Sequence, residues 1–171
     1  MKINRSYAAF ASFFLALAIA LTGCTTDGGS PAESPMGQNS TTGGNMPKVS
    51  GAAGSSPEIT APEGTPPAQL VTEDIFVGDG VTAQPNSTLT VHYTLMAWST
   101  GEVVESSWVG EAATFGLNQV ISGWQQGIPG MKVGGRRLLV IPPDLGYGAA
   151  GGGPIGPNET LIFVVDLLAV S

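Results

Sequence analysis

The sequence is poor in the side chains on which most covalent and metal-dependent catalysis depends. Its 171 residues include one cysteine, Cys24, and one histidine, His92. A lone cysteine forms no intramolecular disulfide, and one histidine among scattered carboxylates gives no ligand spacing typical of zinc. No Gly-x-Ser-x-Gly motif occurs, and His92 lies within an alternating, strand-like stretch. We therefore expect no metal site, no cofactor and no nucleophilic catalysis.

Positive charge is also scarce. Six lysines and arginines stand against 13 aspartates and glutamates, which gives a net charge of −7. This balance disfavours binding to nucleic acid, because such binding depends on basic side chains. The glycine-dense stretch "GYGAAGGG" (146–153) lacks the following Lys-Ser/Thr of a phosphate-binding loop and precedes a strand-like stretch rather than a helix. Neither nucleic acid nor a nucleotide is expected as a ligand.

The longest apolar run, residues 7–21, is too short for a membrane-spanning helix, which needs about 20 residues. It follows Lys2 and Arg5 and ends in "LTGC", an arrangement typical of a secretory signal. The order apolar, small, small, cysteine resembles the lipobox of bacterial lipoproteins. We therefore expect residues 1–23 to be a signal peptide and Cys24 to carry lipid that anchors the protein at the extracytoplasmic face of the cell membrane. The alternative is a plain secretory signal with a chance cysteine.

The next segment, residues 24–65, is composed mainly of Thr, Ser, Gly, Pro, Ala and acidic residues. Its only larger apolar side chains are Met36, Met46, Val49 and Ile59. Such a composition buries too little apolar surface to offset the entropy lost on ordering. We therefore expect residues 24–65 to be a flexible, lipid-anchored linker and residues 66–171 to form one globular domain.

Within that domain the apolar pattern predicts several strands and one short helix. Residues 88–98 alternate, with Leu89, Val91, Tyr93 and Leu95 on one face, which is typical of a half-buried antiparallel strand. Residues 136–142 and 160–170 are rich in branched apolar side chains and predict further strands. A helix is expected from Ser122, which would serve as its N-cap, to the glycines and proline at 127–130. The fold class is therefore α+β.

Five blocks of this domain carry a family resemblance. They are "VHYT" (91–94), "ESSW" (105–108), "VISGWQQGIPGMKVGGRR" (120–137), "IPPDLGYGAAG" (141–151) and "IGPNETLIFVVDLL" (155–168). In this order and spacing the chain resembles the FKBP-type peptidyl-prolyl cis-trans isomerases over residues 66–171. The resemblance implies a twisted antiparallel sheet of five or six strands wrapped around one short helix. It also implies that the ligands are proline-containing polypeptides and macrolides of the tacrolimus and rapamycin class.

The resemblance further implies which residues form the site. Tyr93, Glu105 and Tyr147 are expected to act in catalysis. The substrate-binding residues would be Val104, Phe115, Val120, Ile121, Trp124, Ile155 and Phe163, with Trp124 as the floor of the pocket. The Ile121 N–H and the Tyr147 hydroxyl would donate hydrogen bonds to carbonyls of the bound chain. Rotation of a prolyl amide must break its resonance, and a dry apolar pocket disfavours the planar, charge-separated form, so no nucleophile is needed. The expected function is therefore isomerisation of X–Pro bonds in exported proteins.

The sequence departs from the family in one stretch. Many active members carry Phe-Asp where this chain has Val104 and Glu105, so an aromatic wall is lost. The carboxylate, expected to bond Tyr147 or to polarise the site, has an arm that is one methylene longer. A second interpretation therefore stays open, in which the protein is a proline-binding interaction module with weak or no isomerase activity. A chaperone would need an inserted domain, for which the segment between Ile121 and Arg136 is too short.

Overall fold

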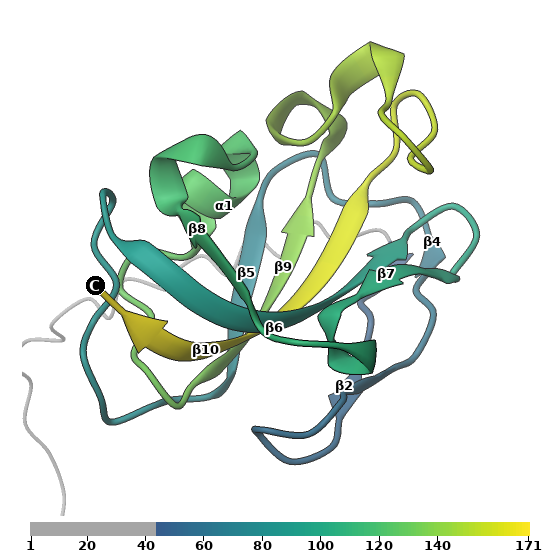
Figure 1. Cartoon of the computed structure of the whole chain (residues 1–171). Coiled ribbons are helices and arrows are strands. Elements are labelled where there is room, and N and C mark those ends of the chain that lie inside the picture. The colour runs from purple at the N-terminus through teal and green to yellow at the C-terminus, as the bar shows by residue number, and fades with distance from the viewer. Residues whose placement is uncertain (1–43) are drawn as a thin grey trace, which may run out of the picture. The chain divides into compact units, whose positions relative to one another are not determined.

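The computed structural model describes residues 44–171 of the chain. Six strands form one antiparallel sheet in the order β5-β9-β10-β6-β7, with β8 paired to the first part of β6 (Figure 1). The strands are β5 (Val71–Phe76), β6 (Thr88–Ala97), β7 (Val103–Ser106), β8 (Ala113–Gly116), β9 (Arg136–Ile141) and β10 (Leu161–Val170). One α-helix of the described region, α1 (Ser122–Gly127), lies on one face of this sheet. The α+β architecture expected from the sequence is confirmed, and the strands expected at 88–98, 136–142 and 160–170 agree to within one residue.

The central strands β10 and β6 differ in apolar pattern, continuous in β10 and alternating in β6, because they differ in burial. β10 pairs with β6 on one side and with β9 on the other, and its first seven residues are all buried. A strand covered on both faces needs a continuous apolar run, which is what residues 161–165 provide. β6 alternates instead: Leu89, Val91 and Leu95 are at most 3% exposed and join the core beneath the helix.

The short helix lies very close to β9 because of two glycines. A Cβ atom at Gly123 would stand 2.4 Å from Ile141 Cγ2, and one at Gly127 would stand 2.5 Å from Leu139 Cδ2. The two glycines are four residues apart and therefore share one face of the helix. Ser122 does not cap the helix as expected, because it is the first helical residue and Ile121 occupies the N-cap position without a side-chain hydrogen bond.

Strand β5 forms one end of the sheet and is tied to the end of the helix. It pairs with β9, and the register shifts between Asp74 and Phe76. Arg137 of β9 forms an ion pair with Asp74, with Nε 2.7 Å from Oδ1, and its Nη1 donates to the Gly127 carbonyl at 2.8 Å. This one guanidinium therefore connects the edge strand with the last turn of α1.

The face of the sheet turned away from the helix is covered by residues 44–65, here called the cover segment. It contains two small antiparallel ladders, β1 (Gly44–Asn45) with β4 (Glu63–Gly64) and β2 (Val49–Ser50) with β3 (Glu58–Ile59) (Figure 1). Met46, Val49 and Ile59 pack against an apolar cluster of the sheet. That cluster consists of Met96, Trp98, Leu138, Val140, Ile162 and Val164.

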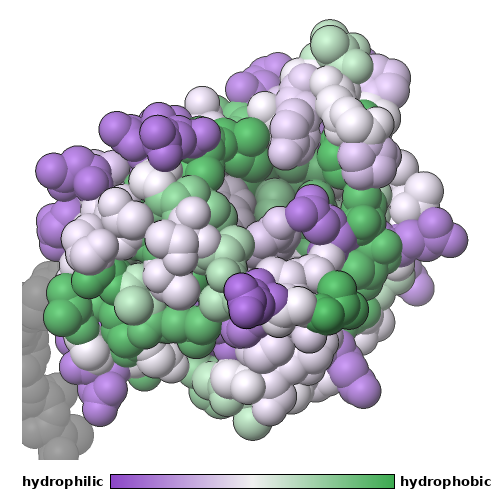
Figure 2. Space-filling view, viewed as in Figure 1, coloured by the Kyte–Doolittle hydropathy of each residue, from purple (hydrophilic) through white to green (hydrophobic). Residues whose placement is uncertain are grey.

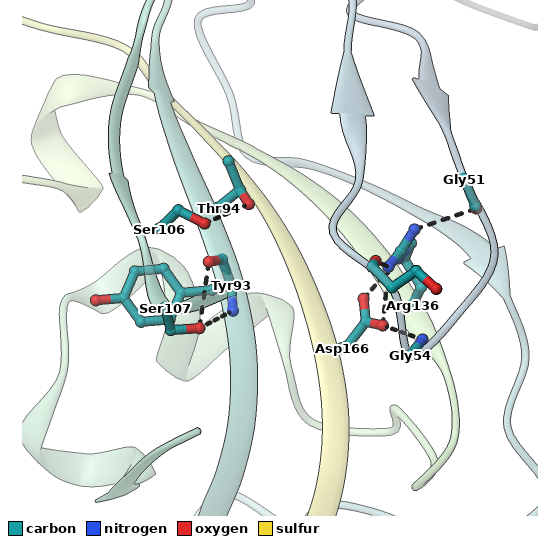
Figure 3. A network of polar contacts seen from close by, with 9 residues as sticks. Gly51, Gly54, Tyr93, Thr94, Ser106, Ser107, Arg136 and Asp166 are labelled. Atoms are coloured by element: carbon teal, nitrogen blue, oxygen red, sulfur yellow. Dashed lines mark hydrogen bonds and ion pairs between the residues drawn. The ribbon is translucent and has the colours of Figure 1, made fainter. Parts of the chain in front are cut away.

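A buried ion pair fastens the cover segment to the sheet (Figure 3). Arg136 is fully buried, and its Nε and Nη2 donate to the Asp166 carboxylate at 2.5 and 2.9 Å. The same guanidinium donates to the carbonyls of Gly51 and Ser55, and the Gly54 N–H donates to Asp166 Oδ2 at 2.8 Å. The turn at residues 51–55 therefore supplies the remaining partners of both buried charges.

For residues 44–65 these contacts differ from the flexible linker that composition predicted for residues 24–65, and residues 24–43 lie outside the described part of the chain. The apolar side chains of residues 46–59 are few, but they meet an apolar face of the sheet, and the turn supplies backbone groups rather than side chains. Composition counts side chains and cannot register either effect. The expected signal peptide and Cys24 lie outside the described residues. Within residues 44–171 no helix is long and apolar enough to cross a membrane.

Candidate functional site

A cavity of about 340 Å³ opens on the helix side of the sheet. It lies near α1 and the segment between β9 and β10, where Figure 2 shows hydrophobic residues set into the surface. The residues that line it are Tyr93, Leu95, Glu105, Phe115, Gln119, Val120, Ile121, Trp124, Tyr147 and Phe163. Eight of these ten side chains are aromatic or branched apolar, and all of the eight except Leu95 were expected from the sequence resemblance.

Trp124 is the most enclosed aromatic side chain of the cavity, with 3% of its surface exposed. Its ring lies edge-to-face with Phe115 and Phe163, at centroid distances of 5.3 Å in both cases, and with Tyr93 at 5.9 Å. Edge-to-face contacts are the favoured geometry for aromatic pairs and fix the orientation of the rings. The indole is therefore held on several sides while it still lines the cavity.

Two hydrogen-bond donors at the cavity have no acceptor within residues 44–171. The Ile121 N–H precedes the first turn of α1, where N–H groups lack intrahelical partners. The Ile121 carbonyl, in contrast, accepts from Trp124 N at 3.0 Å and Gln125 N at 3.2 Å. The second donor is the hydroxyl of Tyr147, whose side chain is 43% exposed. Both donors are thus available to a molecule in the cavity.

The single carboxylate of the cavity is bonded to a tyrosine. Glu105 Oε1 accepts a hydrogen bond from the Tyr93 hydroxyl at 2.5 Å. Burial raises the pKa of Tyr93 well above its ordinary value, and the hydrogen bond to Glu105, its negative charge and Tyr147 add to the effect. Glu105 was expected to bond Tyr147, but its carboxylate bonds Tyr93 instead. Glu105 pairs with Leu95 in the β6–β7 ladder, and Tyr93 is two residues from Leu95 on the same face of β6.

Two serines place β7, and with it Glu105, against β6. Ser107 Oγ accepts the Tyr93 N–H at 2.9 Å, and Ser106 Oγ lies 3.2 Å from Thr94 Oγ1 (Figure 3). Ser107 Oγ is also 3.0 Å from His92 Nδ1, which raises the question of a hydrolytic triad. However, His92 is stacked on Trp108 at 4.2 Å, and the Asp166 carboxylate opposite His92 is bonded to Arg136 and Gly54. These contacts give Ser107 and His92 a structural role.

The structure brings most of the expected site residues together around the cavity, and it separates two of them. Val104 and Ile155 pack into the hydrophobic core, where Ile155 is 7% exposed, rather than lining the cavity. Leu95 and Gln119 line the cavity but were not expected. Leu95 follows Tyr93 by two residues on the same strand face, which the alternation could have indicated, whereas no sequence signal marks Gln119.

Comparison with known proteins agrees with the resemblance found in the sequence. The sequence profile described as "FKBP-type peptidyl-prolyl cis-trans isomerase" matches residues 80–168. The chain belongs to the FKBP-type peptidyl-prolyl cis-trans isomerase family. It is 56% identical over 119 residues to an FK506-binding protein of Streptomyces anulatus, a match that covers 67% of this chain and 96% of that relative. A probable FK506-binding protein of Corynebacterium glutamicum is 48% identical over 114 residues, covering 66% of this chain and 97% of the relative.

Solved structures of FKBP proteins share the fold. Escherichia coli FkpA is 40% identical with a TM-score of 0.57, and the match covers 60% of this chain and 48% of that one. AtFKBP13 is 34% identical with a TM-score of 0.55, covering 60% of this chain and 93% of that one. The present protein is therefore a peptidyl-prolyl cis-trans isomerase by family and by fold. Among the residues described, no group of three or more His, Cys, Asp or Glu side chains is placed to hold a metal ion.

Proposed function

We propose that this FKBP-type isomerase accelerates rotation about X–Pro bonds of exported proteins without a covalent step. One observation carries the proposal: the aromatic cavity combines an enclosed Trp124 with two unpaired donors, the Ile121 N–H and the Tyr147 hydroxyl. Aromatic and branched walls fit a proline ring, and the donors are available to the carbonyls of the bound chain. Such a site needs neither a nucleophile nor a general acid that transfers a proton to the substrate.

The physical basis of the acceleration is desolvation together with positioning. The planar amide is stabilised by resonance, and the barrier to its rotation is about 18–20 kcal/mol. Water stabilises the charge-separated planar form more than the twisted one, so transfer into an apolar cavity lowers the barrier. The two donors hold the flanking chain while the amide rotates, so that binding energy is used at the transition state.

Glu105 and Tyr93 form one wall of this site. The hydrogen bond between them keeps the Tyr93 ring in a fixed orientation beside Trp124. The second carboxylate oxygen of Glu105 has no hydrogen-bond partner within residues 44–171, and the residue is exposed. We expect Glu105 to act through Tyr93 and through its charge rather than as an acid or a base.

The decisive experiment is two-dimensional exchange NMR on a short Ala-Leu-Pro-Phe peptide with catalytic amounts of the protein from residue 24 onward, carrying Cys24→Ser. The native site should accelerate exchange. Tyr147→Phe removes one hydroxyl and should lower kcat/KM about tenfold, the value of one hydrogen bond of about 1.4 kcal/mol. Trp124→Leu should lower it further, whereas Val109→Ala, at a side chain 94% exposed, should change nothing.

Two outcomes would contradict the proposal. If both cavity variants still accelerate exchange as the native protein does, the site must lie outside this cavity. Tight binding of the peptide without any acceleration by the native protein would instead support the interaction module, in which the cavity holds a proline-containing partner without turnover.

We expect macrolides of the FK506 class to occupy the same cavity, because the relatives are named for FK506 binding. FK506 should then abolish the acceleration and quench the fluorescence of Trp124. Inhibition that is unchanged in the Trp124→Leu variant would place the macrolide at another site.

The proposal extends to the membrane. The order "LTGC" and the lack of any second cysteine support lipid attachment at Cys24, with the domain on the extracytoplasmic side. Mass spectrometry of the protein from membranes should find Cys24 as an acylated N-terminus, and Cys24→Ser should release the protein to the soluble fraction. An unmodified Cys24 on a soluble product would exclude the anchor.

A further inference from the structure

The ring of Tyr147 has few contacts of its own that fix its orientation. It is 43% exposed, and within residues 44–171 it makes no hydrogen bond and no contact with another aromatic ring. Its neighbours in sequence are Gly146 and Gly148, which contribute no side chain. A hydroxyl that must meet a carbonyl within a few tenths of an ångström therefore needs another support.

That support is the backbone of Gly152. A Cβ atom at Gly152 would stand 3.0 Å from Cδ1 of Tyr147, 3.6 Å from Cε1 and 3.7 Å from Cγ. Carbon atoms pack favourably at about 3.5–4.0 Å, so the first of these distances is too short. Gly152 therefore faces the tyrosine ring at close range, and a Cβ atom there would require the ring to move by a few tenths of an ångström.

The position of Gly152 is itself fixed by the core. Gly152 N donates to the Ile155 carbonyl and Ile155 N donates to the Gly152 carbonyl, both at 2.9 Å. Ile155 is 7% exposed and belongs to the core cluster that also contains Trp124. The Asn158 N–H donates to the Gly148 carbonyl at 3.0 Å and closes the base of the loop.

We propose that Gly152 is a positioning residue of the isomerase, whose backbone holds the ring of Tyr147 so that the hydroxyl is directed to the bound chain. The inference rests on the donor role of Tyr147 in the proposed function. It also gives Ile155 a role that differs from the expected substrate contact: its buried side chain anchors the loop, and the paired hydrogen bonds carry that anchorage to Gly152 and so to Tyr147.

The test substitutes alanine at two glycines of the same loop. Neither Gly152 nor Gly156 has a φ in the left-handed region, and a Cβ at Gly156 would meet nothing within 4 Å. Gly152→Ala should displace the Tyr147 ring and lower kcat/KM in the peptide exchange assay about as much as Tyr147→Phe does, roughly tenfold for one hydrogen bond. Gly156→Ala should leave kcat/KM unchanged. A Gly152→Ala protein with native kcat/KM would overturn the inference.

A double variant separates positioning from general damage to the loop. If Gly152 acts through the Tyr147 hydroxyl, Gly152→Ala should cost nothing further once Tyr147→Phe is present. Fully additive losses would overturn the inference, because Gly152 would then act on another part of the site. A loss with Tyr147→Phe but none with Gly152→Ala would remove this inference alone, whereas no loss with Tyr147→Phe would remove the donor role in the proposed function.

A measurement on the native protein tests the contact directly. Nuclear Overhauser contacts should connect the Gly152 Hα protons with the Hδ protons of Tyr147, and the ring current should move these Hα resonances away from their positions in the Tyr147→Leu variant. Absence of both signals would overturn the inference whatever the variants do.

Discussion

On the helix side of the sheet, the cavity leaves the Ile121 N–H, the Tyr147 hydroxyl and one oxygen of Glu105 without partners in residues 44–171. On the outer side, the guanidinium of Arg136 and the carboxylate of Asp166 are bonded to each other and to the turn at 51–55. The two faces belong to the same strands, since Tyr93 and His92 are consecutive residues of β6. One face keeps polar atoms available to a ligand, and the other satisfies them within the chain.

The cavity on the helix side and a second cavity beside the cover segment differ in the same sense. The cavity on the helix side is the smaller, at about 340 Å³, but five aromatic rings line it together with a single carboxylate. A larger cavity of about 620 Å³ lies between the cover segment and β5, has no aromatic side chain in its lining and mixes Lys48 with Glu63 and Glu73. The proposed function therefore rests on the chemistry of the lining rather than on the size of the cavity.

The largest effect should come from breaking the buried ion pair. Asp166→Ala leaves Arg136 as an uncompensated charge at a fully buried site, so the free energy of unfolding should fall by about 3–5 kcal/mol. Asp74→Ala is the matched control, because it removes the partner of the adjacent Arg137 at a side chain that is 39% exposed, and it should cost under about 1 kcal/mol. Urea unfolding measures the loss of unfolding free energy in both variants. Equal losses would contradict the distinction between a buried ion pair at Asp166 and a partly exposed one at Asp74.

The next effect concerns the cover segment as a whole. A chain starting at residue 66 should lose about 3 kcal/mol of stability relative to one starting at residue 44, because Met46, Val49 and Ile59 no longer cover the apolar cluster. Its folded fraction should catalyse peptide exchange normally, since the cavity lies on the other face. Thermal unfolding and the exchange assay together check this; equal unfolding temperatures would mean that the cover segment contributes no net stability.

A smaller effect concerns the ionisation of Tyr93. Its folded pKa is raised, so the folded state keeps a proton that the unfolded state loses above about pH 10, and stability should fall as the pH rises beyond that value. Glu105→Gln removes the carboxylate and should let Tyr93 ionise at lower pH, although burial still raises its pKa. Absorbance at 295 nm follows the titration. Identical curves for the two proteins would show that Glu105 has no influence on Tyr93.

The smallest effect is a preference among substrates. None of the four basic side chains of residues 46–171 lines the cavity, whereas Glu105 does. Peptides with lysine beside the proline should therefore be turned over about threefold better than those with glutamate, and 0.5 M salt should remove the difference. Glu105→Gln should abolish the ratio, and Glu102→Gln, on the same hairpin but outside the cavity, should keep it. A ratio that persists at high salt would indicate shape rather than charge.

The sequence predicted best those features that depend on periodicity. The alternation around Tyr93 predicted a strand with the correct face toward the core, because side-chain period and burial are directly linked in a sheet. The branched runs at 136–142 and 160–170 predicted two further strands to within one residue. The family resemblance, applied residue by residue, located most of the residues that line the cavity. The catalytic and binding roles of these residues stay predictions until the variants are measured.

What the sequence did not predict depends on contacts between distant segments. The cover segment holds to the sheet through the carbonyls of Gly51 and Ser55, which every residue possesses and which no motif marks. Ile155 was expected at the cavity because of its place in a motif, but the paired hydrogen bonds with Gly152 turn its side chain into the core. Hydrogen bonds from the Arg136 side chain to carbonyls more than 80 residues away in the sequence are decided by the assembled fold alone.

Within residues 44–171, strand β5 is an edge of the sheet, and this has a consequence for the proposed action on exported chains. An unpaired edge strand can template the addition of further strands and so nucleate aggregates. Here Glu73 and Asp74 place charge on that edge, and the register shift between Asp74 and Phe76 interrupts its regular geometry. Such an edge is a poor template for an extended chain, so under the proposed function the isomerase would bind unfolded chains at its cavity without adding them to its sheet.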